Sequence, residues 1–170
     1  LIPRPETELL VIEAAKIISE KNCKTVLDIG TGSGCIVLSL AIKFPSISFT
    51  GIDNSDSALK TAALNAGLNN IDNVFYKKMD ILNEKPEIKY DFIISNPPYI
   101  PQKDYAALEP EVKYFEPKQA LTDEADGLTF HRRFAGIFQD LLLPGGEFIV
   151  EIGEGQSEAV IDLFRENFHI

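Results

Sequence analysis

The chain has 170 residues, of which 45% are hydrophobic and 25% are charged, a balance typical of one globular domain with a substantial core. Its formal net charge of −10 opposes tight nonspecific binding to nucleic acid, because basic surface supplies most of the affinity for a phosphate backbone. No segment reaches the roughly 18 consecutive apolar residues that a membrane-spanning helix needs, so we expect no membrane partner.

Strand and helix signals alternate along the first half of the chain. In chain order they predict a strand over 25–29, a helix over 35–44, a strand over 47–52, a helix from Ser55 to Gly67 and a strand over 74–78. Ser55 is a good N-cap and Gly67 a good C-terminal stop for the second of these helices. Its apolar residues Leu59, Ala62, Ala63 and Ala66 lie on one face, which we expect to be buried.

The second half continues this alternation around a long irregular segment. In chain order it predicts a strand over 90–95, the irregular segment 100–125, a helix over 128–143, a turn at Pro144-Gly-Gly146, a strand over 147–152 and a helix over 157–168. Irregular segments of that length are more often functional than idle. The alternation predicts an α/β fold with a doubly wound, mostly parallel sheet, which binds ligands at the carboxyl ends of its strands.

A glycine loop, Asp28-Ile-Gly30-Thr31-Gly32-Ser33-Gly34, connects the first predicted strand to a helix. Glycines are needed where a backbone turns tightly and a ligand touches it. The dehydrogenase fingerprint needs Gly or Ala three residues after Gly32, but Cys35 stands there. The Lys-Ser/Thr ending of a P-loop is absent as well. The spacing therefore argues against a pyrophosphate site, and a tight turn without a ligand is the alternative.

Two acidic residues follow predicted strands and are candidates for the same site. Asp53 ends the second strand, where a carboxylate can accept hydrogen bonds from both hydroxyls of a ribose. Nicotinamide cofactors are held in the same way, so Asp53 does not by itself select the cofactor. Asp80 follows the third strand. A helix cap or a solvated loop acid is the alternative for Asp53. Asp80 is the weaker signal, because Asp-Ile-Leu after a strand is a common sequence.

Asn96-Pro97-Pro98-Tyr99 after the fourth strand is the most specific feature of the sequence. Two prolines fix φ and remove two N–H donors, which leaves a stiff turn that presents acceptors. The Asn96 side-chain oxygen and the Pro97 carbonyl can accept both protons of an –NH2 group, while Tyr99 offers a flat face to a planar group. Such a grip orients an amide or amine nitrogen and stabilises positive charge that develops on it.

These motifs resemble those of class I methyltransferases, whose motif I has the glycine spacing seen here. Asn-Pro-Pro-Tyr is shared by N6-adenine methyltransferases and by the HemK/PrmC release-factor glutamine methyltransferases. Four further blocks resemble the second family: Ile2-Pro-Arg-Pro-Glu-Thr-Glu8, Pro110-Glu-Val112 with Phe115-Glu-Pro117, Asp126-Gly-Leu128 and Glu151-Ile-Gly153. The resemblance therefore covers nearly the whole chain.

The resemblance implies a Rossmann-like methyltransferase fold and an enzyme that uses S-adenosylmethionine to methylate the glutamine of the Gly-Gly-Gln loop of peptide chain release factors. It assigns cofactor binding to Gly30, Thr31, Gly32, Ser33, Gly34, Asp53, Asp80, Ile81 and Asn96, with Asp80 near the adenine amino group and Ile81 against the ring. It assigns the substrate to Asn96, Pro97, Pro98 and Tyr99, with Asn96, Pro97 and Tyr99 in catalytic roles. The implied partner is a release factor, with no nucleic acid and no membrane.

Both ends of the chain depart from the family pattern. We expect residues 1–170 to be one catalytic domain of a longer protein, without the family's N-terminal helical substrate domain and its closing C-terminal hairpin. The free cysteines Cys23 and Cys35 favour a cytoplasmic location, and no metal is expected. His131 and His169 are interpreted as surface or helix residues. The alternatives are an N6-adenine nucleic-acid methyltransferase and a non-catalytic cofactor- or nucleotide-binding module.

Overall fold

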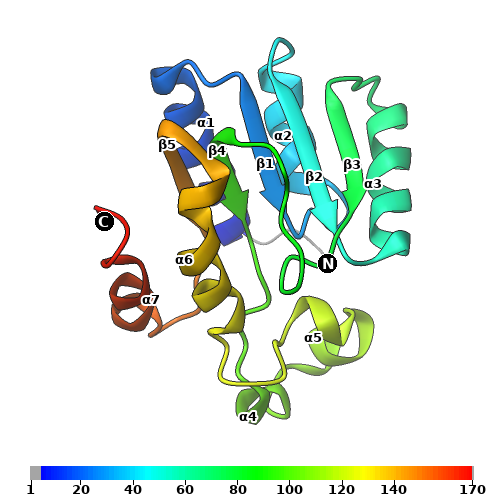
Figure 1. Ribbon diagram of the computed structural model, residues 1–170. Helices are drawn as coiled ribbons and strands as arrows, with labels where there is room; N and C mark the ends of the chain where they lie inside the picture. The colour runs from blue at the N-terminus through cyan, green and yellow to red at the C-terminus, as the bar shows by residue number, and fades with distance from the viewer. Residues whose placement is uncertain (1–4, 170) are drawn as a thin grey trace. The chain divides into compact units, whose positions relative to one another are not determined.

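The computed structural model in Figure 1 describes residues 5–169. They divide into two compact units. The first, here called the sheet unit, comprises residues 5–96 and 141–151. The second, the helical unit, comprises residues 97–140 and 152–169. Residues 1–4, which carry the start of the Ile2–Glu8 block, lie outside the described residues, as does Ile170.

A five-stranded parallel sheet forms the centre of the sheet unit. Its strands are β1 (Thr25–Ile29), β2 (Ser48–Asp53), β3 (Val74–Lys78), β4 (Tyr90–Ser95) and β5 (Leu142–Val150). The spatial order β3-β2-β1-β4-β5 places the chain reversal between β1 and β4. Parallel sheets bind ligands at such a reversal, beyond the carboxyl ends of the strands. The α/β fold class expected from the sequence is confirmed.

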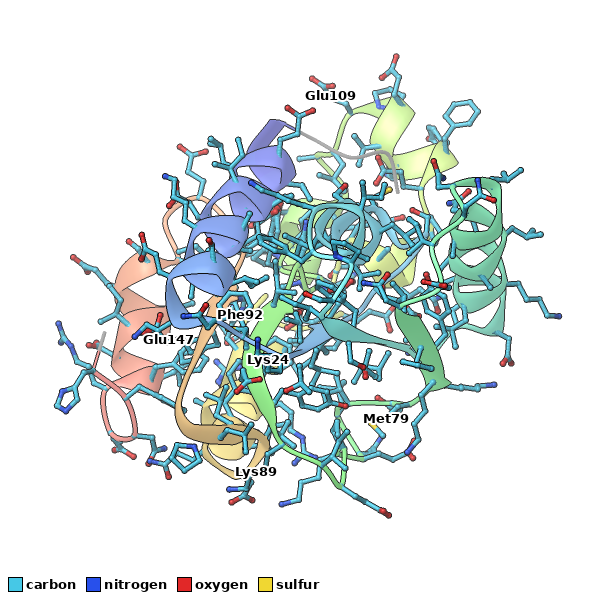
Figure 2. All side chains as sticks on the ribbon, turned by 90° about the horizontal axis from the view of Figure 1, so that it is seen from above. Lys24, Met79, Lys89, Phe92, Glu109 and Glu147 are labelled. Atoms are coloured by element: carbon cyan, nitrogen blue, oxygen red, sulfur yellow. The ribbon has the colours of Figure 1, made fainter. Side chains whose placement is uncertain are left out.

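Helices α1 (Pro5–Lys21), α2 (Cys35–Lys43) and α3 (Asp56–Leu68) accompany this sheet (Figure 1). One core joins α1 and α2 to the sheet face that carries Val26, Phe49 and Phe92, all of which are fully buried. Figure 2 labels Phe92 on its strand and shows Glu147 of β5 beside α1, where its carboxylate pairs with Lys21 at 2.5 Å. Burial of these large apolar side chains stabilises the packing of α1 and α2 on the sheet.

Most element boundaries agree with the sequence prediction, and the differences have local causes. The bounds of β1, β3 and β4 are those predicted. Helix α3 is capped by Ser55, which accepts a hydrogen bond from the backbone N–H of Ala58 at 3.3 Å. The predicted stop at Gly67 is wrong, because the helix continues to Leu68 and Asn69 is its C-cap. Ala63 was expected on the buried face but is exposed.

The predicted turn at Pro144-Gly-Gly146 is an irregularity inside β5. Tyr90 pairs with Leu142, but Phe92 pairs with Glu147, so the intervening residues of β5 bulge out of the register. Gly145 has φ 80°, which glycine adopts without strain. Regular pairing with β4 resumes at Glu147, so the irregularity inserts extra residues into β5 and leaves the rest of its pairing with β4 intact.

The helical unit contains α4 (Gln102–Tyr105), α5 (Pro110–Phe115), the 3-10 turn η1 (Lys118–Ala120), α6 (Thr129–Leu141, whose last residue belongs to the sheet unit) and α7 (Ser157–Phe164). The segment expected to be irregular, 100–125, therefore carries three short helical pieces and a parallel bridge between Ile100 and Thr122. Stacked rings of Phe134 and Phe138 and the tilted ring of Phe164 pack α6 against α7.

The two histidines were interpreted as surface or helix residues, and His131 does lie on helix α6. It is fully buried there, with its ring 6.4 Å from that of Phe134. The last helix was expected to reach Phe168 but ends at Phe164, after which the chain turns so that the N–H of Phe168 donates to the Phe164 carbonyl. The ring of Phe168 still packs on that of Phe164, which explains the continued apolar pattern.

Candidate functional site

The glycine loop leaves β1 at Ile29 and enters α2 at Cys35. Gly30, Gly32 and Gly34 have φ of 74°, 56° and 87°, in the left-handed region that other residues rarely adopt. The N–H of Gly34 donates to the Thr31 carbonyl at 2.8 Å, which closes the turn before the helix. The alternation of glycine with Thr31 and Ser33 thus follows from a backbone that needs φ above zero at every second position.

Asp53, at the end of β2, holds the middle of this loop. Its Oδ2 accepts a hydrogen bond from the N–H of Gly32 at 2.9 Å, and its Oδ1 accepts one from the N–H of Ser55 at 2.9 Å. A carboxylate has about four acceptor positions, so each oxygen of this half-buried group keeps a lone pair for a ligand. Asp53 therefore orders the loop and remains able to accept two hydroxyl groups.

A second carboxylate, Asp28, lies beneath the loop and is fully buried. Its Oδ2 accepts a hydrogen bond from the Thr31 hydroxyl at 2.7 Å, while its Oδ1 has no hydrogen-bond partner among the described residues. Burial raises the pKa of Asp28 to about 7, and the charge of the nearby Asp53 also raises it. The hydrogen bond from the Thr31 hydroxyl and the backbone N–H of Val37 both lower the pKa but do not outweigh these effects. Gly51 makes room for this arrangement, since a Cβ there would lie 2.9 Å from Thr31 Oγ1.

Asp80 and Ile81 follow β3 after Met79 and form a tight turn. Asp80 Oδ1 accepts from the N–H of Leu82 at 3.1 Å, and its Oδ2 accepts from Asn83 Nδ2 at 2.7 Å. Ile81 is 6% exposed. Asp80 is thus a turn-forming residue whose carboxylate retains acceptor capacity, and it lies one strand further from the chain reversal than Asp53.

Asn96 follows β4, directly beside the glycine loop. Ser95 pairs with Ile29 in the sheet, and its hydroxyl donates to the Ile29 carbonyl at 2.8 Å. A Cβ on Gly30 would lie 4.0 Å from the Asn96 carbonyl oxygen, so the two strand ends are in close proximity. The structure therefore brings the loop 30–34, Asp53 and Asn96 to the carboxyl ends of three adjacent strands.

Two residues from distant parts of the sequence orient the Asn96 side chain. Asn96 Nδ2 donates to Thr7 Oγ1 at 3.2 Å, and the Thr7 hydroxyl donates to Glu151 Oε2 at 3.2 Å. Thr7 belongs to α1 and is 8% exposed, and Glu151 directly follows β5. Because the amide N–H2 is engaged by Thr7, the Asn96 Oδ1 is the atom left to accept a hydrogen bond from a ligand.

The rest of the Asn-Pro-Pro-Tyr segment belongs to the helical unit. Pro97 is buried, and Tyr99 is half-buried. The Tyr99 carbonyl accepts a hydrogen bond from Gln156 Nε2 at 2.9 Å, and the N–H of Ile100 donates to the Leu121 carbonyl at 3.0 Å. The tyrosine end of the segment is therefore anchored through its backbone.

The sequence analysis did not predict four residues of this arrangement, namely Thr7, Gly51, Glu151 and Gln156. Thr7 and Glu151 lie inside blocks that resemble HemK/PrmC proteins, and this resemblance was the one feature of the sequence that could have indicated a role for them. Among residues 5–169, no group of three or more His, Cys, Asp or Glu side chains is placed to hold a metal ion. Nor is any helix in that range both long and apolar enough to cross a membrane.

Comparison with known proteins gives a family match. The model of the methyltransferase small domain matches residues 6–112. Release factor glutamine methyltransferase of Streptococcus pneumoniae is 45% identical over 98% of this chain and 59% of its own length. The protein of the same name from Thermodesulfovibrio yellowstonii is 42% identical over 94% of this chain and 58% of its own length. That from Fusobacterium nucleatum is 40% identical over 98% of this chain and 48% of its own length.

The chain thus spans between about half and three fifths of the curated relatives it matches. Solved structures share its fold. A ribosomal protein L11 methylase from Lactobacillus delbrueckii subsp. bulgaricus has a TM-score of 0.68 at 22% identity, over 96% of this chain and 69% of that one. The hMettl16 catalytic domain has a TM-score of 0.75 at 20% identity, over 99% of this chain and 64% of that one.

Proposed function

Since the chain belongs to the methyltransferase small domain family, we propose that it transfers a methyl group from S-adenosylmethionine to the side-chain amide nitrogen of the glutamine in the Gly-Gly-Gln motif of a peptide chain release factor. The relatives at 40–45% identity are named release factor glutamine methyltransferase. The observation that carries the proposal is the Asn96 side chain, held by Thr7 so that its oxygen is free to accept, at the strand end beside Gly30.

The cofactor fits the residues at the chain reversal. Gly30, exposed and without a Cβ, lets a ligand approach the backbone. Each Asp53 oxygen keeps a lone pair for a ribose hydroxyl. The buried Asp28 has one oxygen without a hydrogen-bond partner among residues 5–169, and a cationic ligand near the loop would stabilise its ionised form. S-adenosylmethionine, when bound, supplies the activated methyl group.

We assign the adenine end of the cofactor to Asp80 and Ile81. The turn that follows β3 places both residues next to the β2 end that carries Asp53. A remaining lone pair of the Asp80 carboxylate would accept from an amino group, and the side chain of Ile81 offers apolar surface to a ring. Thr31 and Ser33 complete the loop. The Thr31 hydroxyl donates its hydrogen bond to Asp28.

The segment Asn96–Tyr99 supplies the grip on the substrate amide. Asn96 Oδ1 and the Pro97 carbonyl accept its two N–H groups, and the Tyr99 ring provides a flat face. The lone pair of an amide nitrogen is delocalised, so the nitrogen must pyramidalise and gain positive charge as its bond to the methyl carbon forms and the bond from that carbon to sulfur breaks. One amide proton would then leave to water, so the products would be a neutral N-methyl amide and S-adenosylhomocysteine. Fixed acceptors stabilise that charge, and positioning supplies most of the rate.

A glutamine side chain suits this site better than adenine in a nucleic acid. The chain carries a net charge of −10, which repels a phosphate backbone at physiological salt. A glutamine on an exposed loop is a planar primary amide on a flexible stem and needs no basic surface to reach the site. The proposed partner is therefore a protein, and a cytoplasmic location follows from a substrate that acts in translation termination.

The test is transfer of a labelled methyl group to three acceptors under identical conditions. They are a purified release factor, the same factor with the Gly-Gly-Gln glutamine replaced by alanine, and duplex DNA. We expect label in the first acceptor and background in the other two. Label in DNA, or equal label in the alanine-substituted factor, would overturn the substrate assignment.

A further inference from the structure

One glutamine of the helical unit uses its whole amide group to join three segments of the chain. Gln156 Oε1 accepts a hydrogen bond from the N–H of Gly153 at 2.8 Å. Its Nε2 donates to the Tyr99 carbonyl at 2.9 Å and to the Gly127 carbonyl at 3.3 Å. Gln156 is half-buried and is the N-cap residue of α7, yet its side chain does not cap that helix. Its side chain instead serves the loop that ends the Asn-Pro-Pro-Tyr segment.

The glycines around this amide show how closely the backbone is fitted to it. Gly127 is buried with φ 84°, and a Cβ there would lie 2.4 Å from the Tyr99 carbonyl oxygen and 2.7 Å from Gln156 Nε2. A Cβ on Gly153 would lie 3.0 Å from Gln156 Oε1 and 3.1 Å from Tyr99 Cδ2. Glycine at both positions thus lets two backbone segments close around Gln156 and the Tyr99 ring.

The hydrogen bond from Gln156 to the Tyr99 carbonyl matters more because two prolines precede Tyr99. Pro97 and Pro98 have no N–H, so they cannot hold the segment in place by donating hydrogen bonds. Hydrogen bonds hold the two ends of the segment instead. Asn96 is held within the sheet unit by Thr7, and Tyr99 is held within the helical unit by Gln156.

We propose that Gln156 is a positioning residue for methyl transfer, acting through the Tyr99 carbonyl to fix the segment that receives the substrate amide. The inference rests on the proposed function. Gln156 would not touch substrate or cofactor. Its role requires one acceptor and two donors on one planar group, which a glutamine amide provides and a carboxylate does not. A displacement of about 1 Å in a positioning group can reduce a rate by about a hundredfold.

The experiment compares Gln156→Glu with Gln139→Glu. Gln139 is an exposed glutamine of the same unit whose Nε2 also donates to a backbone carbonyl, that of Asn167 at 3.0 Å. Glutamate at 156 keeps an acceptor for Gly153 but turns a carboxylate oxygen towards two carbonyls. Gln156→Asn, which stays neutral and is one methylene too short, is the second variant. Wild type and variants are assayed for methyl transfer to release factor and for S-adenosylmethionine affinity by calorimetry.

We expect both Gln156 variants to lose kcat by about tenfold to a hundredfold, with cofactor Kd within about twofold of wild type, because Gln156 bonds none of the loop 30–34. Gln139→Glu should leave kcat unchanged. A direct readout is the carbonyl ¹³C signal of Tyr99 in tyrosine-labelled protein, assigned as the signal that Tyr99→Phe removes. This signal should shift in the Gln156 variants and stay in place in Gln139→Glu.

Three results would contradict the positioning role of Gln156, and they can be told apart. If both Gln156 variants keep near wild-type kcat, the positioning role is wrong while the proposed function stands. If cofactor affinity and melting temperature fall in parallel with kcat, Gln156 only stabilises the fold, and the inference is again wrong. If wild-type protein binds cofactor but methylates no release factor, the proposed function fails, and the positioning role fails with it.

Discussion

Replacing Asp28 by asparagine should stabilise the protein at neutral and alkaline pH. Asp28 is fully buried, and one of its carboxylate oxygens lacks a hydrogen-bond partner among the described residues. An ionised carboxylate in that position is costly, which is why its pKa is raised from 3.8 to about 7. Asparagine keeps an oxygen to accept the Thr31 hydroxyl and carries no charge, so the variant removes the cost and retains the contact.

The sign and size of the effect follow from linkage. Well below pH 3.8, the ordinary pKa of an aspartate, Asp28 is protonated in both the folded and the unfolded chain, so the variant should change stability little there. As pH rises from about 4 to 7 the unfolded chain ionises first, and the folded wild type loses stability relative to it. A pKa difference of about three corresponds to roughly 4 kcal/mol at 1.36 kcal/mol for each pH unit. For a chain of this size that is a rise in melting temperature on the order of 10 °C at pH 8.

The assay is urea unfolding of both proteins without cofactor between pH 4 and pH 8. Asp91→Asn is the control, because the pKa of Asp91 is lowered and its replacement should change the stability in the opposite direction. Partial burial raises the pKa of Asp91, but hydrogen bonds from the backbone N–H groups of Lys24 and Thr25 and from the Thr25 hydroxyl outweigh this and lower the pKa overall. Asp91→Asn should therefore lose stability above about pH 4. A free energy of unfolding that differs by a constant amount between Asp28→Asn and wild type across this range would contradict a raised pKa of Asp28.

Three further predictions concern the site. Asp53→Ala should weaken S-adenosylmethionine binding by about 1.5–3 kcal/mol in calorimetry, the usual contribution of hydrogen bonds to a charged group, and unchanged affinity would remove Asp53 from the site. Asn96→Ala should lower kcat by about a hundredfold or more while cofactor affinity is largely kept, which steady-state kinetics would contradict if turnover stayed near wild type. Thr7→Val, which frees the Asn96 amide to rotate, should lower kcat less than Asn96→Ala, and an equal or larger loss would show that Thr7 does more than orient Asn96.

The sheet and the glycine loop were predictable because local sequence determines them. The run 25–29 is apolar and β-branched and ends at glycines, and the structure places β1 over those residues. Gly30, Gly32 and Gly34 need positive φ, which explains their spacing without reference to the rest of the fold. The helix after Ser55 was predictable from its cap, although its end was not, because Gly67 tolerates helical dihedrals and Asn69 ends the helix.

Long-range contacts were not predictable in the same way. The hydrogen bond between Thr7 and Glu151 joins residues 144 apart in the sequence, and that between Gln156 and Tyr99 joins residues 57 apart. Neither pairing leaves a periodicity or a spacing rule in the sequence. The burial of His131 has the same cause, because tertiary packing of α6 and not local polarity decides which face is covered.

The most direct test of the account is to locate the methyl group in the product. Release factor is incubated with the chain and S-adenosylmethionine, digested, and analysed by tandem mass spectrometry. We expect one added methyl on the side-chain nitrogen of the Gly-Gly-Gln glutamine, formed by wild type and strongly reduced with Asn96→Ala. A methyl group on another side chain, or one formed equally well by Asn96→Ala, would contradict it.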